Sequence, residues 1–191
     1  MKRVAPYPLS LSAALLLAAL SPSACKSDIE KIREINDIQN IPSLRIENLD
    51  GRMTELGGIK VRFITPELRQ FYFAEEKYTD FPKGIKLYRY LDSATVEASV
   101  VADHAINYEA KELWEATGNV VVKNMQGDEL RTEKLFWSQK TKKIYTDALV
   151  NIIDTEKGAV IFGKGLTSDE SFTDYEIKEV FNSVIYVDDK K

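Results

Sequence analysis

The alternation of apolar and polar residues along the chain changes at Gly58. From there on, short runs rich in β-branched and aromatic residues are separated by Gly, Asn, Asp and Pro, which is typical of β-strands joined by turns. Strands are predicted in GIKVRFITPEL, GIKLYRYLDS, ATVEASVVADHAINYEA, ELWEATGNVVVKN, LRTEKLFWSQ, KKIYTDALVNIID, GAVIFGKG and FNSVIYVDD. Turns are predicted at 124–127, 139–142 and 154–158, and the best of the few helical windows is 68–76. The pattern predicts an all-β fold.

Strict alternation is clearest in the segment KKIYTDALVNIID. Successive side chains of a strand point to opposite faces, so every second residue shares a face. One face of this strand is predicted to carry Ile144, Thr146, Ala148, Val150 and Ile152. The strand is therefore expected to bury one side only.

A weak internal repeat relates successive strands. The unit reads apolar-x-aromatic, a turn, and a strand ending V-x-[V/I], and it recurs at an offset of 29 or 30 residues. Hairpins of this kind stack into a sandwich, a jelly roll or an open β-solenoid, because one hairpin cannot bury its own apolar face. The repeat defines a candidate interior made of Ile106, Tyr108, Trp114, Val120, Val122, Leu135, Trp137, Ile144, Val150 and Ile152. The pattern is compatible with a dry, close-packed core and with a groove, open along one side, that holds acyl chains.

The start of the chain has the layout of a secretory signal peptide. A short basic region with Lys2 and Arg3 precedes the apolar segment 9–20, and small residues lead up to Cys25. The apolar segment is shorter than the about 20 residues that span a bilayer. Cys25 is the only cysteine, and LSPSAC resembles a bacterial lipobox, in which the cysteine receives a diacylglycerol. We expect a lipid anchor at Cys25 rather than ordinary cleavage that leaves a free thiol.

The predicted organisation is a lipoprotein signal peptide over 1–24, a lipid anchor and tether over 25–44, and a periplasmic β-domain over 45–191. Every third residue is isoleucine near the start of the tether, at Ile29, Ile32, Ile35 and Ile38. This spacing could form one apolar stripe of a partner-binding helix. A polar tether that is helical for part of the time is favoured, because isolated helices this short are marginal in water.

The charge balance argues against a nucleic-acid partner. Residues 1–24 hold two basic residues and no acidic one, so the remaining chain has 24 Lys and Arg against 30 Asp and Glu, a net charge of −6. Proteins that bind nucleic acid contact phosphates through an excess of basic residues. This chain has no such excess, nor a basic cluster at either end to bind anionic lipid heads.

The sequence offers little catalytic chemistry. His104 is the only histidine, and a metal site or catalytic triad needs further ligands or a placed nucleophile, so a histidine on a strand surface is favoured. GKGLTSDES lacks the following helix of a nucleotide-binding loop, so its glycines are predicted to permit a bulge or a close backbone approach. The carboxylate pairs 169–170 and 188–189 are interpreted as solvated. The chain is predicted not to be an enzyme and to hold no cofactor or metal.

Several motifs together resemble a known family. They are GNV, G-x-x-L-x-T-E-x-L-x-W, K-x-I-Y-T-D and G-x-G-L-x-S-D, in the segments GNVVVKNMQGDELRTEKLFWSQKTKKIYTDALVNI and IFGKGLTSDESFTDYEI. FPKGIKLYRYLDSATVEASVVADHAINYEAKELWEATGNV fits upstream. In their order and spacing, over about residues 45–187, they resemble the lipopolysaccharide-export periplasmic component C (LptC) family in its lipoprotein form.

The resemblance implies an open β-jelly roll (OstA-like) with an apolar groove and no bound nucleotide. It implies that the domain accepts lipopolysaccharide, through its lipid A acyl chains, from inner-membrane ABC transporter permeases and passes it to a periplasmic bridge protein of similar fold. The edge near 58–64 is expected to face the transporter and the edge near 183–187 the bridge. Many family members use a transmembrane helix, whereas this chain is expected to be anchored at Cys25, to the inner membrane.

Two other functions remain open from the sequence. The chain could be a structural adaptor lipoprotein that docks partners through its β-edges and carries no lipid. Far less favoured is a carbohydrate-active or other hydrolytic lipoprotein that uses the carboxylate pairs.

Overall fold

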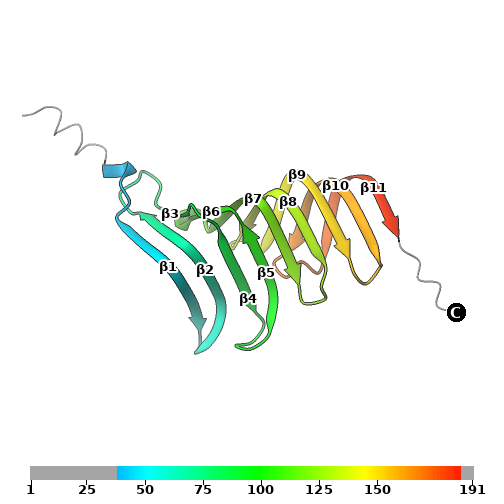
Figure 1. The fold of residues 1–191 in the computed structure, drawn as a ribbon, viewed down its shortest axis with the longest axis horizontal. Coiled ribbons are helices and arrows are strands. Elements are labelled where there is room, and N and C mark those ends of the chain that lie inside the picture. The colour runs from blue at the N-terminus through cyan, green and yellow to red at the C-terminus, as the bar shows by residue number, and fades with distance from the viewer. Residues whose placement is uncertain (1–37, 186–191) are drawn as a thin grey trace, which may run out of the picture. The chain divides into compact units, whose positions relative to one another are not determined.

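The structure is a computed structural model that describes residues 38–185 (Figure 1). The predicted signal peptide, the anchor at Cys25 and the tether up to residue 37 lie outside the described residues, as does the acidic pair 188–189. Within them, the chain forms one antiparallel sheet and two short 3-10 turns, Ile38–Asn40 and Glu109–Lys111.

The sheet has eleven strands: β1 (Leu44–Glu55), β2 (Gly58–Phe71), β3 (Tyr78–Phe81), β4 (Ile85–Tyr90), β5 (Val96–Ala102), β6 (His104–Tyr108), β7 (Leu113–Asn124), β8 (Glu129–Ser138), β9 (Lys143–Asp154), β10 (Ala159–Asp169) and β11 (Tyr175–Ile185). From β7 to β11, each strand pairs with the next one along the chain. β1 and β11 lie at opposite ends of the sheet, and each pairs with one neighbour (Figure 1). The predicted all-β, jelly-roll-like class is confirmed.

Some predicted elements are confirmed and others are wrong. Strands end and begin as expected around the turns near 124–127, 139–142 and 154–158. The helical window at 68–76 is wrong, because Leu68 to Phe71 continue β2. β1 was not predicted, since LRIENLDGRMTE has few β-branched residues, and it is a strand because it pairs with β2 from Leu44–Gln70 to Glu55–Gly58.

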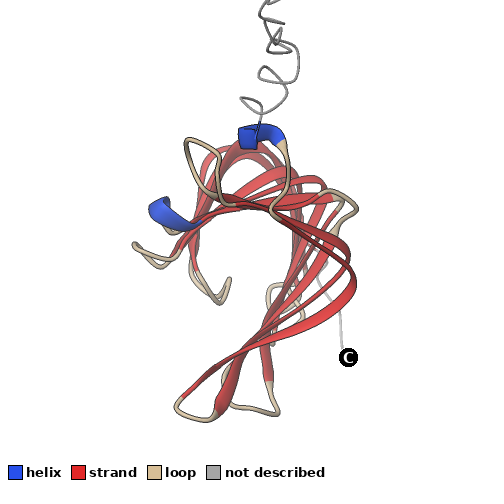
Figure 2. Ribbon diagram, turned by 90° about the vertical axis from the view of Figure 1, so that its left-hand side faces the viewer, coloured by secondary structure: helices blue, strands red, loops and turns tan. Residues whose placement is uncertain are grey.

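The sheet folds over on itself between β2 and β7. β2 pairs with β4 through Val61–Ile64 and with β3 through Arg69–Phe71. β7 pairs likewise with β6 near its start and with β5 near its end. β4 and β5 therefore belong to one layer, and β3 and β6 to the other. Figure 2 shows the strands curving so that the two halves of the sheet face each other.

A line of bends, here called the crease, crosses the sheet where it folds. It passes through Gly84 between β3 and β4, Asp103 between β5 and β6, and Gly118 in β7. Gly84 has φ +88°, and a Cβ there would lie 2.9 Å from the Ala102 carbonyl oxygen. This bend therefore requires glycine.

Threonine hydroxyls donate to backbone carbonyl groups where strand pairing is irregular, at the crease and between β8 and β9. Thr65 Oγ1 donates to the Gly84 carbonyl oxygen at 2.8 Å, and Thr132 Oγ1 donates to that of Leu149 at 2.8 Å. Buried backbone groups without hydrogen-bond partners are costly, so these hydroxyls stabilise the folded sheet.

The hydrophobic core lies between the two halves of the folded sheet. Its buried members are Leu68, Phe81, Ile85, Ala102, Ala105, Val120, Val122, Leu130, Leu135, Ile144, Val150, Ile152, Leu166 and Phe172. All but Phe172 belong to strands, and Phe172 lies on the loop between β10 and β11.

Candidate functional site

The inner face of the folded sheet carries most of the sequence-predicted interior. Strand register places neighbouring members side by side, with Trp114 opposite Trp137 and Trp137 opposite Ile144. Eight of the ten predicted residues lie on this face: Trp114, Val120, Val122, Leu135, Trp137, Ile144, Val150 and Ile152. The alternation predicted for β9 is also found, since Ile144, Val150 and Ile152 are buried and Asp147 and Leu149 are exposed.

Ile106 and Tyr108 lie on the opposite, outer face. Their neighbours in β6 are the inward residues, because Ala105 pairs with Ala116, and Asn107 pairs with Trp114. The internal repeat aligns Ile106 and Tyr108 with Leu135 and Trp137 in the sequence. The pairing of the strands is shifted by one residue from this alignment. A slip of one residue moves a side chain to the other face of a sheet, so these two do not join the interior.

The inner face is sealed between β7 and β11. Val120 and Ile152 are each 0% exposed, and the other predicted residues there are nearly as buried. They form one cluster with Leu130, Leu166 and Phe172, each also 0% exposed. We call this part the sealed core; it comprises Val120, Val122, Leu130, Leu135, Ile144, Val150, Ile152, Leu166 and Phe172.

The inner face is open at the two tryptophans. Trp114 and Trp137 stack with ring centroids 6.2 Å apart, and Phe81 stacks on Trp114 at 5.4 Å. Three adjoining spaces, all lined by Trp137, have volumes of about 40, 210 and 560 Å³. We call them together the Trp mouth; Met53 and Val61 line it from the β1–β2 side.

The rim of the Trp mouth is polar. Trp137 Nε1 donates to Glu170 Oε1 at 2.9 Å. Arg89 pairs with Glu97 at 3.1 Å and with Glu170 at 3.3 Å. The Nε1 of Trp114 is buried and donates to no protein acceptor. The mouth therefore combines aromatic walls, one free indole N–H and a charged border.

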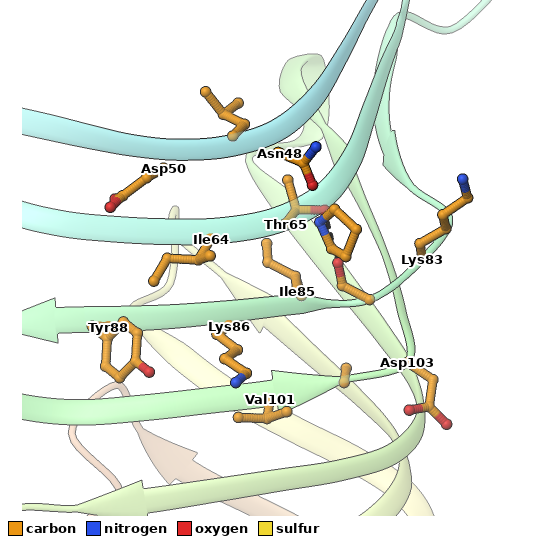
Figure 3. A pocket seen from close by; sticks show the side chains of 14 residues that line it. Asn48, Asp50, Ile64, Thr65, Lys83, Ile85, Lys86, Tyr88, Val101 and Asp103 are labelled. Atoms are coloured by element: carbon orange, nitrogen blue, oxygen red, sulfur yellow. Dashed lines mark hydrogen bonds between the residues drawn. The ribbon is translucent and has the colours of Figure 1, made fainter.

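A hollow of about 670 Å³ lies on the outer face at the crease (Figure 3). Lys86 and Tyr88 line it and alternate along β4 with the core residue Leu87, so it opens away from the core. Its charges are partly used within the protein: Asp50 pairs with Arg62, and Lys83 pairs with Glu67. No pattern in the sequence indicated this hollow, because its lining residues come from four strands and the connections between them.

Residues weighed as catalytic candidates have structural contacts. His104 lies on β6, with Nε2 2.7 Å from Asp80 Oδ1 and Nδ1 3.3 Å from Thr117 Oγ1. Asp169 Oδ1 accepts hydrogen bonds from the backbone N–H of Thr173 and Asp174 within its own loop. Among residues 38–185, no group of His, Cys, Asp and Glu is placed to hold a metal ion.

The glycines of GKGLTSDES act as predicted. The β10–β11 register shifts at Gly163, where a Cβ would lie 2.6 Å from the Glu179 carbonyl oxygen. Gly165 has φ +71° at the shift between β10 and β9. Both glycines therefore permit irregularities in β10.

Within residues 38–185, two strand edges flank the site without a partner strand, β1 at one end of the sheet and β11 at the other. The edge expected near 58–64 is wrong, because these residues belong to β2, which pairs with both β1 and β4. On β11, Val180 and Phe181 are 57% and 59% exposed. An exposed apolar edge is a template for pairing with another strand.

None of the helices in the described part of the chain is long and apolar enough to cross a membrane.

A protein-family model matches most of the chain. The family model described as "Lipopolysaccharide-assembly, LptC-related" matches residues 11–182. Among curated proteins, none matches the chain.

Proposed function

The chain belongs to the LptC-related family of lipopolysaccharide-assembly proteins, and from this premise we propose that it is a periplasmic relay for lipopolysaccharide. Membership implies a part in lipopolysaccharide transport and a place in the cell envelope, and the family is a transport component rather than an enzyme family. In the proposed relay, the inner face shields acyl chains while the sugars stay in water.

The observation that carries this proposal is the Trp mouth. It is an aromatic-walled space that leads from the surface onto the apolar inner face. Burial of one CH₂ group contributes about 0.8 kcal/mol, so even part of an acyl chain gains several kcal/mol there. Tryptophan suits such an entrance because it joins a large apolar ring to one polar N–H. The buried Nε1 of Trp114 has no protein acceptor, and a lipid that reached it could supply an ester or amide carbonyl.

The partners follow from the two free edges. We propose that the β1 edge meets the permeases of the inner-membrane ABC transporter and that the β11 edge meets the periplasmic bridge protein. Strand addition at both edges would extend one continuous sheet from the transporter to the bridge. The exposed Val180 and Phe181 support a partner at β11. A lipid at Cys25 would hold the protein at the inner membrane.

The test is photocrosslinking from the mouth. Benzoyl-phenylalanine replaces Trp137 in the full chain, which is then illuminated with purified lipopolysaccharide. Phe136 is the matched control, because it is the adjacent aromatic residue and lies on the outer face, stacked on Tyr145. We expect crosslinks from position 137 and none from position 136. Absence of crosslinks at both positions in folded protein would contradict the relay.

The sealed core favours a second candidate, the structural adaptor. A close-packed interior needs no lipid, and the edges alone could join two partners. In that case a proline at an edge position of β11 abolishes binding to the bridge, while lipopolysaccharide never crosslinks to position 137.

A further inference from the structure

The loop between β10 and β11 enters the interior of the sheet. It spans residues 170–174, in the polar run SDESFTDYE, with Phe172 as its one large apolar residue before Tyr175. Phe172 is 0% exposed and belongs to the core cluster, and its ring stacks on Tyr175 at 5.3 Å. A loop residue therefore fills space between strands of the sealed core.

The loop is ordered by its own hydrogen bonds. Asp169 Oδ1 accepts from the backbone N–H of Thr173 at 2.8 Å and of Asp174 at 3.0 Å. The Phe172 N–H donates to the Asp169 carbonyl oxygen at 3.2 Å. These local contacts can stay intact if the loop moves as a unit.

Side chains from other strands hold the loop in place. Asn124 Nδ2 donates to the Phe172 carbonyl oxygen at 2.8 Å. Ser171 Oγ donates to Glu97 Oε1 at 2.7 Å and accepts from Arg89 Nη1 at 3.0 Å. The ends of β4, β5 and β7 are thus tied to the loop through exchangeable polar contacts.

The loop lies at the boundary between the open and the sealed parts of the interior. Glu170 lines the Trp mouth and bonds Trp137, whereas Phe172, two residues later, is in the sealed core. Beyond Phe172 comes Tyr175 on β11, the edge strand. An acyl chain that entered at the tryptophans and continued toward β11 would meet Phe172.

We propose that the space filled by Phe172 is a second acyl-chain site, closed by a displaceable plug. This inference rests on the proposed relay function. The contacts of Glu170 and Ser171 hold the plug in place when no lipid is bound, and an incoming acyl chain replaces the Phe172 ring. Roughly four to six methylene groups bury as favourably as one phenylalanine side chain, so a single acyl chain is long enough to offset its displacement.

The experiment places one probe before the plug and one behind it. Benzoyl-phenylalanine replaces either Trp137 or Tyr175 in the full chain, and purified lipopolysaccharide is the ligand. We expect crosslinks from both positions.

Glu170→Gln removes the charge that pairs with Arg89, so the open plug becomes more populated and lipid gains access to position 175. The crosslinking yield at position 175 should rise about tenfold at limiting lipid, as expected for the loss of one charged hydrogen bond. Because Glu170 also lines the Trp mouth, the yield at position 175 is read as a ratio to the yield at position 137 in the same variant.

Phe172→Ala removes the plug itself and should raise the yield at position 175 at least as much. Glu179→Gln, a charge change on the exposed side of β11, is the matched control and should leave both yields unchanged. If Phe172→Ala fails to fold, Glu170→Gln still decides the outcome, because it retains the buried ring.

The outcomes separate the plug from the relay. Crosslinks at position 137 but none at position 175, in wild-type protein and in both variants, would overturn the plug and leave the relay standing. No crosslink at either position would overturn both. Equal yields at position 175 in wild-type protein and Glu170→Gln would show that the loop contacts do not hold a closed state.

Discussion

Two parts of the same inner face differ in what lies opposite them. Val120 and Trp114 lie on the same strand and the same face, yet Val120 is fully buried and Trp114 lines an open space. In the sealed core, Phe172 and the adjoining Tyr175 fill the interior. At the Trp mouth, Met53, Val61 and the tryptophans line a space of about 210 Å³. The difference teaches that contacts between distant segments, and not the strand pattern alone, decide where the interior is open.

The two parts also differ in what stabilises them. The sealed core is apolar and close-packed. The N-terminal part of the sheet has a buried carboxylate, Glu67, 0% exposed at its side chain, with Arg45, Arg69 and Lys83 within 2.7–2.8 Å. A buried ion needs such partners, because an unpaired charge there is strongly destabilising.

The largest expected effect comes from emptying the sealed core. Phe172→Ala should lower the free energy of unfolding by about 3–5 kcal/mol, since the variant loses burial and gains a cavity. Phe136→Ala, on the half-buried outer face, should lower it by only about 1 kcal/mol. Urea denaturation measures both, and equal losses would contradict a close-packed interior at Phe172.

A smaller effect is expected from adding one methyl group to a glycine. In Gly163→Ala the new Cβ meets the Glu179 carbonyl oxygen and Ile177 Cγ2, each at 2.6 Å, so β11 must shift. We expect a loss of about 1–3 kcal/mol in the free energy of unfolding. Gly58→Ala is the control in the N-terminal part, where the nearest atom is the Ser93 side-chain oxygen at 3.2 Å. It should be close to neutral in thermal unfolding.

The pH dependence of stability tests the charge cluster. Hydrogen bonds from Lys83 and then Arg69 lower the pKa of Glu67 to about 2. A carboxylate with a lowered folded pKa stabilises the fold above its ordinary pKa, and that stability is lost as pH falls toward the folded value. Glu67→Gln should therefore lower the melting temperature at pH 7, and the difference from wild-type protein should shrink as the pH falls toward 2. A difference that persists unchanged to pH 2 would assign the effect to packing.

The smallest effect on stability is expected at the β11 edge. Phe181→Glu changes an exposed side chain and should alter the free energy of unfolding by less than about 0.5 kcal/mol. It should nevertheless weaken binding to the periplasmic bridge protein, which the relay places at this edge. Leu149→Glu, equally exposed but away from the edge, is the control for a pull-down measurement. Unchanged binding by Phe181→Glu would place the bridge elsewhere.

Local patterns were read correctly from the sequence. The alternation of β9 and the turns around it depend on neighbouring residues, and so do the bulge glycines Gly163 and Gly165. Interactions between distant segments could not be read from the sequence. β1 and β3 carry weak strand signals and are strands because β2 pairs with both. The one signal for the plug was an isolated phenylalanine in the polar run SDESFTDYE.

The sequence by itself determined the all-β class, the apolar face of β7, β8 and β9 and, through its motifs, the family. These follow from side-chain alternation and from residues a few positions apart, which a linear sequence contains. Only the tertiary structure decided that Ile106 and Tyr108 face outward and that Phe172 seals part of the interior. The first depends on strand register, where one residue reverses the face, and the second on a loop packing against strands about 50 residues earlier in the chain.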